Sequence, residues 1–433
     1  MDNAVVGYIA FAVLISFICL GVPIAWAITL VAAGGMVYLS GLEQASVQFF
    51  TTAFNSGSEF LFASIPLFIL MGQIVSQARI GEDLYDCFHK WFGRLPGGLA
   101  VTSVMSCAAF GAVTGVSSAA VGTMARMVMP EMKRYGYDMR LATGSLATAA
   151  TIAIMIPPSL LMVLYGLWTE TSIGKLFIGG IVPGILMALM FSAYIMIRCA
   201  INPSLGPVGK RYPLRERVAS LVKLVPIVVI FVIVIGGMYS GIFTPGEAAG
   251  AGSGGVLVVA LVMRRLTWRA FVEAAIDTAK LSIMIFAILV SATVLSRFFV
   301  ATQVTTSVIE AMGDSGLNRY TIFAMIVVMY LVLGCILDAF GMILLTLPFV
   351  FPIVVKLGFD PVWFGIMLTL LTEIALVTPP VGINVYILSK IVPDVPMGTI
   401  FAGVTPFVTL AILLVILMTV FPDIALWLPN RMR

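Results

Sequence analysis

The sequence predicts an all-α, polytopic membrane protein with two inverted repeats, on the basis of three observations. The 433-residue chain is 61% hydrophobic and only 10% charged, which is too few charges to cover a soluble surface. Two Pro-Pro pairs, Pro157-Pro158 and Pro379-Pro380, each interrupt an apolar segment long enough to cross a membrane. Basic residues gather in a few short loops, as expected when loop charge sets the orientation of membrane helices.

The two Pro-Pro pairs lie 222 positions apart, and other residues repeat at the same offset. The further matching pairs are Pro130 with Pro352, Gly136 with Gly358, and Asp138 with Asp360. Coincidences this numerous at one offset indicate an internal duplication of the chain.

Each Pro-Pro pair is predicted to break its helix near the middle of the membrane. Proline lacks a backbone donor and its ring clashes with the preceding turn, so two in succession leave backbone groups unpaired. Such a break is tolerated at membrane depth only where protein buries it or where it lines a cavity.

The chain is predicted to begin with membrane spans at 4–21 and 22–41, an interfacial segment at 42–60 and a span at 61–79. The next segment is amphipathic, because Leu84, Cys87, Phe88, Trp91 and Phe92 recur at helical spacing opposite charged residues and His89. We expect this helix to lie on the membrane with its polar face, His89 included, in solvent.

Residues 99–129 fit a re-entrant helical hairpin better than one long tilted span. The small polar residues of the stretch GAVTGVSSAAVG fall in the middle of this segment. A hairpin keeps Arg94 on the same side of the membrane as Lys133, Arg134 and Arg140, which the positive-inside rule favours.

The remaining chain is expected to repeat this order after a basic cytoplasmic loop at 198–223. The predicted elements are a broken helix at 141–171, spans at 176–197, 224–241, 246–263 and 281–300, an interfacial piece at 301–318, a hairpin at 320–354, a broken helix at 362–389 and a last span at 400–427.

Four parts follow from this order. They are N-terminal scaffold helices at 1–60, a first inverted repeat at 61–200, a basic linker with a second scaffold hairpin at 201–280, and a second inverted repeat at 281–433. Lys356 alone follows the second hairpin, against three basic residues after the first, so the second hairpin is expected to enter from the opposite, periplasmic face.

Candidate ligand oxygens gather at the two hairpin tips and the two breaks. Unwound carbonyls and half-helix ends coordinate ions without a dedicated charged side chain, and hard oxygen ligands of this kind suit Na⁺. The first set is Thr114, Ser117 and Ser118 opposite Ile156, Pro157, Pro158 and Ser159; the second is Asp338, Ala339, Phe340 and Gly341 opposite Thr378, Pro379 and Pro380.

Purely structural roles compete with these assignments. The prolines can simply kink packed helices, and the small residues can serve close helix contact. Asp338 can cap a half-helix, and Glu373 can hydrogen-bond across a helix interface. Against these structural roles, a carboxylate inside an apolar membrane segment is costly enough that a functional role is the first hypothesis. Arg126 and Arg297 are candidate partners for a carboxylate substrate, but snorkelling to the interface is the simpler account of both.

Other functional classes find little support. Five scattered cysteines with a single histidine and no CxxC argue against zinc sites and disulfides, and no organic cofactor is expected. The net charge of +4 comes from basic residues in the short loops that set the orientation of the membrane helices, and it does not indicate nucleic-acid binding. An enzyme would need a catalytic set that the chain lacks, and a channel would use half-helices as a filter.

Several stretches together resemble the large membrane subunit of tripartite ATP-independent periplasmic (TRAP) transporters over essentially the whole chain. They are LPGGLAVTSVMSCAAFGAVTGVSSAA, IMIPPSLLMVLYGLWTETSIGKLFIGGIVPG, TPGEAAG, LDAFGMILLTLPFVFPIV, GFDPVWFG and VTPPVGINVYIL. The resemblance implies an elevator-type, sodium-coupled secondary transporter in the bacterial inner membrane. It also implies two protein partners, a small four-helix membrane subunit and a periplasmic binding protein that delivers an organic anion such as a dicarboxylate or sialic acid.

The resemblance also distributes roles among the tip and break residues. The cation ligands would be Thr114, Gly115, Ser117, Ser118, Ile156 and Pro157 in one site and Asp338, Gly341, Thr378 and Pro379 in the other. The residues facing the substrate would be Ser118, Pro158, Ser159, Ala339, Pro380 and Asn384. The first tip reads Gly-Val-Ser-Ser where many relatives have Gly-Ser directly, so the liganding serine is either Ser117 or Ser118.

The function predicted from the sequence is therefore the permease subunit of a Na⁺-coupled importer of an organic anion. The alternative is an autonomous ion-coupled anion carrier that needs no binding protein, with an ion channel as a more remote possibility. The identity of the anion, the choice between Na⁺ and H⁺, the stoichiometry and the oligomeric state stay open at this point.

Overall fold

The computed structural model describes residues 3–307, 310 and 316–432, and in this part of the chain the regular elements are all helices. Eight of the described helices are long and apolar enough to cross a membrane, or nine if one bent pair counts as a single span. The predicted class, an all-α multi-span membrane protein, is confirmed.

The helices of the first half follow the predicted order. They are α1 (Asn3–Cys19), α2 (Ile24–Ser58), the 3-10 turn η1 (Phe60–Ala63), α3 (Ser64–Gln77), α4 (Ile80–Phe92), α5 (Gly98–Thr114), α6 (Ser117–Arg134), α7 (Met139–Met155), α8 (Leu160–Thr169) and α9 (Ile173–Ile201).

The rest of the chain begins with the 3-10 turn η2 (Pro203–Leu205) and a helical run over 214–239. That run comprises α10 (Leu214–Ser220), η3 (Leu221–Leu224), α11 (Val225–Phe231), the π-helical turn η4 (Val232–Gly236) and α12 (Gly237–Tyr239). The later helices are α13 (Pro245–Val262), α14 (Trp268–Ala301), α16 (Arg319–Leu333), α17 (Ala339–Lys356), α18 (Pro361–Ala375), α19 (Ile383–Ile391), α20 (Met397–Val420), α21 (Asp423–Leu426) and the 3-10 turn η5 (Pro429–Arg431). The interfacial piece predicted at 301–318 lies in part outside the described residues.

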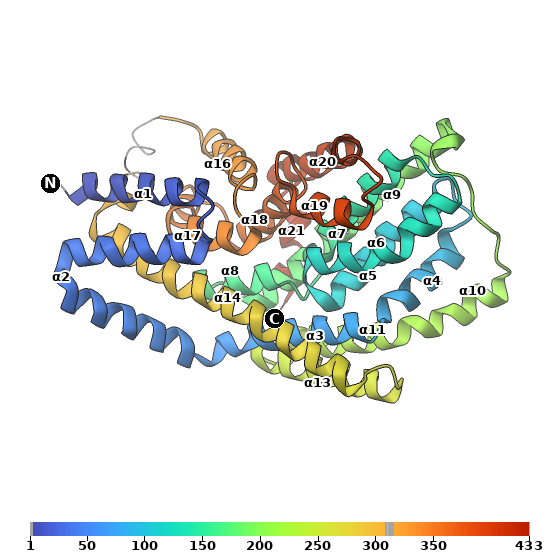
Figure 1. The fold of residues 1–433 in the computed structure, drawn as a ribbon, viewed down its shortest axis with the longest axis horizontal. Helices are drawn as coiled ribbons and strands as arrows, with labels where there is room; N and C mark the ends of the chain where they lie inside the picture. Colours follow the sequence, from blue (N-terminus) through green and yellow to red (C-terminus); the bar gives the residue numbers. More distant parts are fainter. Residues whose placement is uncertain (1–2, 308–309, 311–315, 433) are drawn as a thin grey trace.

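The helix α2 contains a sharp turn at Gly41, whose backbone is left-handed with φ 79°. Figure 1 shows the two arms of α2 lying one above the other, with the bend at one end of the molecule. The boundary expected between a span at 22–41 and a separate segment at 42–60 is therefore real. The placement of the second arm at the membrane interface stays a prediction.

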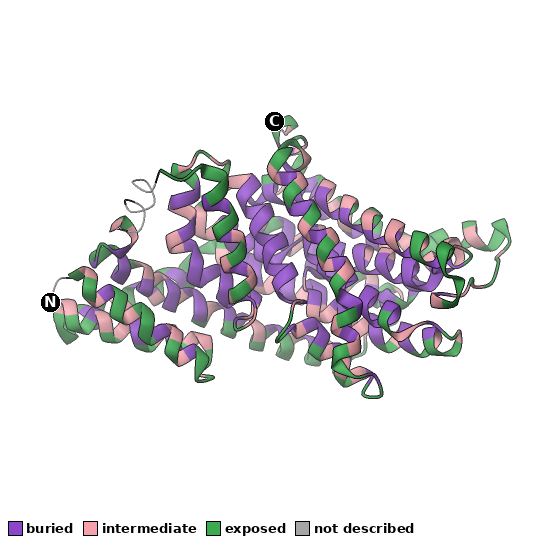
Figure 2. Ribbon diagram, turned by 90° about the horizontal axis from the view of Figure 1, so that it is seen from above, coloured by how far each residue is buried: buried purple, intermediate pink, exposed green. Residues whose placement is uncertain are grey.

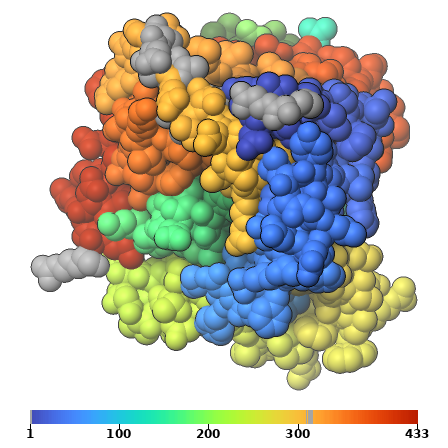
Figure 3. Space-filling model, turned by 90° about the vertical axis from the view of Figure 1, so that its left-hand side faces the viewer, coloured from blue at the N-terminus to red at the C-terminus, as the bar shows by residue number. Residues whose placement is uncertain are grey.

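Two groups of helices pack around a buried centre. The long helix α14 packs against α2 and α3, and α3 packs against α13, while α5, α7, α9 and α20 pack together on the other side. Figure 2 shows buried residues concentrated in the central helices and exposed residues along the outer ones. Seen end-on in Figure 3, the blue N-terminal helices lie beside the yellow-orange α14, and orange segments of the C-terminal part lie on the other side of α14.

The residues that repeat at the 222-position offset have a local structural reason. Asp138 accepts a hydrogen bond from the Leu141 amide at the start of α7, and Asp360 accepts from Val362 and Trp363 at the start of α18. Both are helix N-caps, which satisfy amides that the helix itself leaves free. Gly136 and Gly358, at φ 72° and 75°, supply the left-handed turns that end the preceding helices.

The polar face of α4 is not in solvent as expected, because basic segments cover it. His89 is only 6% exposed, stacks on Tyr85 and lies edge-on to Tyr212. Asp83 is also buried and pairs with Arg265 in the turn between α13 and α14. The expectation of a solvated His89 was wrong because residues distant in sequence supply the covering side chains.

Asp86 on α4 lies 2.8 Å from both Lys223 of η3 and Lys90 of its own helix. Partial burial raises the pKa of this carboxyl, but hydrogen bonds and charge attraction from the two lysines outweigh burial and lower the pKa below its usual value. A carboxyl whose pKa is lower in the folded than in the unfolded state stabilises the fold. This contribution is fully present above the pKa of the unfolded state, which is about 4, and it is lost as the pH falls through the pKa of the folded state.

We therefore expect Asp86→Asn to lower the melting temperature of the purified protein at pH 7. The difference in melting temperature between the variant and the native protein should become smaller below about pH 4. Intrinsic fluorescence melting in detergent across that pH range is the measurement. Asp277→Asn, which removes an exposed pair with Lys280, is the matched control and should show no such narrowing. A gap that stays constant down to pH 3 would contradict the assignment.

Candidate functional site

The first hairpin turns at a left-handed glycine. Gly115, at φ 61°, ends α5, and the extended residue Val116 leads directly into α6. Thr114 is buried, and its hydroxyl donates to the Phe110 carbonyl within α5. The tip therefore presents a short turn of backbone with hydroxyl side chains at both helix ends.

This tip lies directly against the first broken helix. A methyl group built on Gly115 would lie 2.4 Å from the Pro158 carbonyl oxygen, and one on Gly111 would lie 2.1 Å from the Ala153 Cα. Only glycine permits such close approach of two backbones. The structure thus brings the predicted first tip and first break into contact.

The break itself separates α7 from α8, whose axes differ by 41°. Ile156, Pro157 and Pro158 form the irregular segment, and the Pro157-Pro158 bond is cis. Ser159 caps α8 by accepting from the Met162 amide at 3.4 Å. The side chain of Ser159 is buried, so the amino end of α8 is held inside the protein.

The second hairpin is built differently at its tip. Gly334 ends α16, a turn follows at Cys335 and Ile336, and Asp338 caps α17 by accepting from the Phe340 and Gly341 amides at 3.1 and 3.4 Å. Of the two roles considered for Asp338, the capping role is observed. Capping leaves carboxylate lone pairs available, so it does not preclude a cation contact.

The second tip also lies against its break. The Cys335 thiol donates to the Pro379 carbonyl at 3.2 Å, and a methyl group on Gly334 would lie 2.0 Å from the Ala375 Cβ. Thr378 lies at the end of α18 and donates its hydroxyl to the Ala375 carbonyl at 3.0 Å. The Pro379-Pro380 bond is cis, like its counterpart.

The two breaks differ in exposure. Pro157, Pro158 and Ser159 are buried, whereas Pro379 and Pro380 are exposed. The first break is therefore enclosed by protein in this conformation, and the second is open at the surface of the chain.

The two halves meet between these sites. α6 packs against α19, and α7 packs against both α18 and α19. At this junction the Ser117 hydroxyl donates to the Glu373 carboxylate at 3.4 Å, and the end of α6 is tied to the loop after α19 by a 2.6 Å ion pair between Lys133 and Asp394.

Asn384 joins this junction from the start of α19. Its backbone amide donates to the Leu376 carbonyl at 3.2 Å, across the second break. The side chain is fully buried, and its oxygen and nitrogen have no hydrogen-bond partner among the described residues. An unpaired amide in such a place is available to a ligand.

The two candidate arginines are not brought to the tips. Arg126 is exposed on the outer surface of α6. Arg297 lines a separate cavity of 350 Å³ with Met36 and Gln48 of α2. Neither position supports a direct contact with a substrate held between the tips, which agrees with snorkelling.

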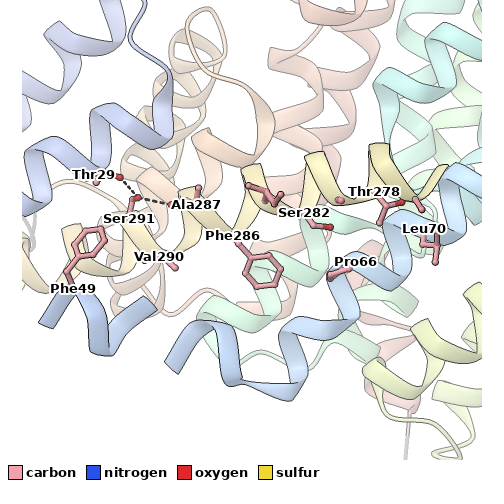
Figure 4. Close-up of a pocket in the computed structure, with 13 residues that line it drawn as sticks. Thr29, Phe49, Pro66, Leu70, Thr278, Ser282, Phe286, Ala287, Val290 and Ser291 are labelled. Atoms are coloured by element: carbon pink, nitrogen blue, oxygen red, sulfur yellow. Dashed lines mark hydrogen bonds between the residues drawn. The ribbon is translucent and has the colours of Figure 1, made fainter. Parts of the chain in front are cut away.

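A larger cavity of 740 Å³ lies between α2, α3 and α14, and Figure 4 shows its lining. It is mostly apolar, with Thr29 and Ser291 joined by a 2.6 Å hydrogen bond at one end. The residues that line it belong to neither tip and neither break. This cavity is therefore a feature of the outer helices and is separate from the candidate site.

The donor chemistry of the tips suits a hard cation. Hydroxyls, backbone carbonyls and single carboxylates are the ligands available, and the part of the chain that the structure describes holds no group of three or more His, Cys, Asp or Glu residues placed to bind one metal ion. Such oxygen sets fit alkali and alkaline-earth ions and are unsuited to zinc or copper.

A helical membrane protein with two broken helices, each facing the tip of a helical hairpin, has the architecture of a secondary transporter. Residues 11–424 match the family model of the tripartite ATP-independent periplasmic transporter, DctM component. The chain belongs to this family, whose members are transporter permease subunits and not enzymes.

Two curated relatives illustrate the likeness. The chain is 33% identical to the C4-dicarboxylate TRAP transporter large permease protein of Pseudomonas aeruginosa, over 87% of this chain and 88% of that protein. It is 28% identical to the sialic acid TRAP transporter large permease protein of Vibrio cholerae, over 95% of each chain.

A solved structure supports the fold at a greater distance. The crystal structure of the Alcanivorax borkumensis YdaH transporter aligns over 90% of each chain with a TM-score of 0.62 and 14% sequence identity. At that sequence identity the structural similarity shows only that the two proteins share a fold.

Reasoning from the sequence left one partner unnamed and missed one residue of the site. Glu373 was expected to hydrogen-bond across a helix interface, and it does so with Ser117 of the first tip, a partner that the sequence did not identify. Gly72 on α3 supports the same tip, because a methyl group there would lie 2.7 Å from the Thr114 carbonyl oxygen. Neither contact has a local sequence signal, since each joins residues of different helices.

Gly115→Ala should destabilise the protein, because alanine at φ 61° is strained and its methyl group would clash with the Pro158 carbonyl. We expect a loss of about 1–3 kcal/mol, seen as a lower melting temperature in detergent. Gly122→Ala on α6, where the methyl group meets open space, is the control and should melt at or above the native temperature. Equal melting temperatures for both variants would show that the tip does not depend on this close contact.

Proposed function

We propose that this chain is the permease subunit of a Na⁺-coupled secondary transporter in the bacterial inner membrane, importing an organic anion that a periplasmic binding protein delivers. The single observation that carries the proposal is the pairing of each hairpin tip with a broken helix. Two such pairs give two sets of carbonyl and hydroxyl oxygens, one in each half of the chain.

The first sodium site is proposed between the tip Thr114–Ser118 and the break at Ile156 and Pro157. The second is proposed between Asp338, Gly341, Thr378 and Pro379. Support comes from the direct contacts of Gly115 with Pro158 and of Cys335 with Pro379, which hold each tip on its break.

The anion is proposed to bind between the two tips, with Ser118, Pro158, Ser159, Ala339, Pro380 and Asn384 as the residues that face it. Two helix amino ends support this placement. The N-cap positions of α6 and α19 are Val116 and Gly382, neither of which caps its helix with a side chain, and the two helices pack together. Free backbone amides at helix amino ends favour anions.

A carboxylate is the proposed substrate class, with dicarboxylates and sialic acid as the first compounds to test. The relatives from Pseudomonas aeruginosa and Vibrio cholerae are named for these substrates. The family's description as tripartite supports a small membrane subunit and a periplasmic binding protein as partners.

Movement is proposed to be of the elevator type, with the hairpins and broken helices moving against a scaffold of α1, α2 and α10–α13. Inverted repeats of opposite membrane orientation underlie this arrangement. The difference in exposure between the buried first break and the exposed second break supports a conformation in which one side of the site is open.

The decisive experiment is uptake of radiolabelled organic acids into proteoliposomes that contain this chain, its small subunit and the cognate binding protein. Uptake that requires both an inward Na⁺ gradient and the binding protein supports the proposal and identifies the substrate. Uptake that is indifferent to the binding protein would instead establish an autonomous anion carrier.

In the same assay, Ser118→Ala and Asp338→Ala should each abolish Na⁺-driven uptake while the complex still assembles. Asp338 also caps α17, so Asp360→Ala is the matched control, because it removes the equivalent cap of α18 away from both tips. The control should cost about 1 kcal/mol of stability and keep most uptake. Normal uptake kinetics in both tip variants would refute the assignment of these residues.

A further inference from the structure

Glu373 is a fully buried carboxylate at the junction of the two halves. It is 0% exposed, and one of its oxygens accepts from the Ser117 hydroxyl at 3.4 Å. The other oxygen has no hydrogen-bond partner within the described part of the chain, and no ion pair found there includes Glu373. A carboxylate in apolar surroundings without a cationic partner is costly, so its retention calls for a function.

The carboxylates of the candidate site are distributed unequally between the halves. The second tip has Asp338, but the position 222 residues earlier is Val116. The position 222 residues before Glu373 is Thr151, whose hydroxyl donates to the Thr148 carbonyl. The first tip therefore lacks an acid of its own, and Glu373 reaches it from the second half.

The direction of the hydrogen bond matters for the chemistry of Ser117. Since its O–H donates to Glu373, the lone pairs of Oγ are directed away from the carboxylate and are free to act as a ligand. A hydroxyl held in this way offers an oxygen to a cation, and the nearby negative charge strengthens the attraction.

We propose that Glu373 is a positioning residue for cation binding at the first tip. It orients the Ser117 hydroxyl, and when Na⁺ is bound its carboxylate supplies the negative charge that the first tip does not contain. This inference rests on the proposed function, because it takes Na⁺ to be the ion bound there.

The position of Glu373 also links the two ion sites. It lies on α18, five residues before Thr378 at the second break, while its carboxylate contacts the first tip. A shift of α18 at the second break therefore changes the distance between Glu373 and Ser117. Binding at the two sites is coupled through this contact, and the coupling is reciprocal.

The test is the sodium dependence of thermal stability, measured on the purified full-length protein in NaCl against choline chloride. Glu373→Gln keeps an oxygen that can accept from Ser117 but removes the charge. We expect the half-maximal Na⁺ concentration, at which a fit of the melting data places half of the folded protein in the Na⁺-bound form, to rise about tenfold. Far above that concentration the melting temperature should rise by the same amount per decade of Na⁺ as in the native protein, while general destabilisation of the fold would lower the melting temperature in choline chloride without changing the half-maximal Na⁺ concentration.

Two further variants complete the experiment. Ser117→Ala removes the donor without changing α18 and should also raise the half-maximal Na⁺ concentration, and the double variant should show less than the combined effect of the two single changes. Thr151→Val, at the equivalent position of the first half, is the control and should match the native protein. If Glu373→Gln cannot be purified, Glu373→Asp, which withdraws the carboxylate from Ser117 by one methylene, takes its place and should also raise the half-maximal Na⁺ concentration; unchanged Na⁺ binding in that variant would overturn the role of Glu373.

The possible failures are distinguishable. A native protein stabilised by Na⁺ together with an unchanged Glu373→Gln or Ser117→Ala would overturn the role of Glu373 and leave sodium coupling standing. A native protein that Na⁺ does not stabilise relative to choline would overturn sodium coupling, and the role of Glu373 with it.

Discussion

The structure depends on one constraint, which is that backbone interrupted inside an apolar protein must find its partners within that protein. Each Pro-Pro pair interrupts the backbone hydrogen bonding of its helix, and the first pair is buried within the protein. The chain answers with a helical hairpin whose tip presses against each break, so that Gly115 contacts Pro158 and Cys335 donates to Pro379. In the proposed mechanism, the backbone oxygens of these breaks are ligands of the cation.

The two tips solve this problem with different side chains. The first uses a left-handed glycine and hydroxyls, whereas the second uses an aspartate cap and a thiol donor. The two halves therefore share the pairing of a tip with a break but differ in the side chains that make it. The contact from Ser117 to Glu373 then joins the halves at the point where they differ most, because an acid of the second half lies beside the first tip.

The burial of α4 shows how sequence patterns fail when distant segments meet. Its amphipathic pattern correctly predicted a helix, but the polar face was expected in solvent. Lys223 and Arg265 instead cover that face and pair with Asp83 and Asp86. Helical periodicity reports which side chains share a face, and it says nothing about whether an oppositely charged loop will cover that face.

The sequence by itself determined the membrane class and the positions of the two breaks and of the two helical hairpins, because hydropathy, proline chemistry and helix capping act over a few neighbouring residues. Asp138 and Asp360 are clear examples, since each caps the helix that follows it. Only the tertiary structure decided that the tips contact their breaks and that Glu373 reaches Ser117. Those contacts join helices far apart in the chain, and they depend on close packing that no local pattern encodes.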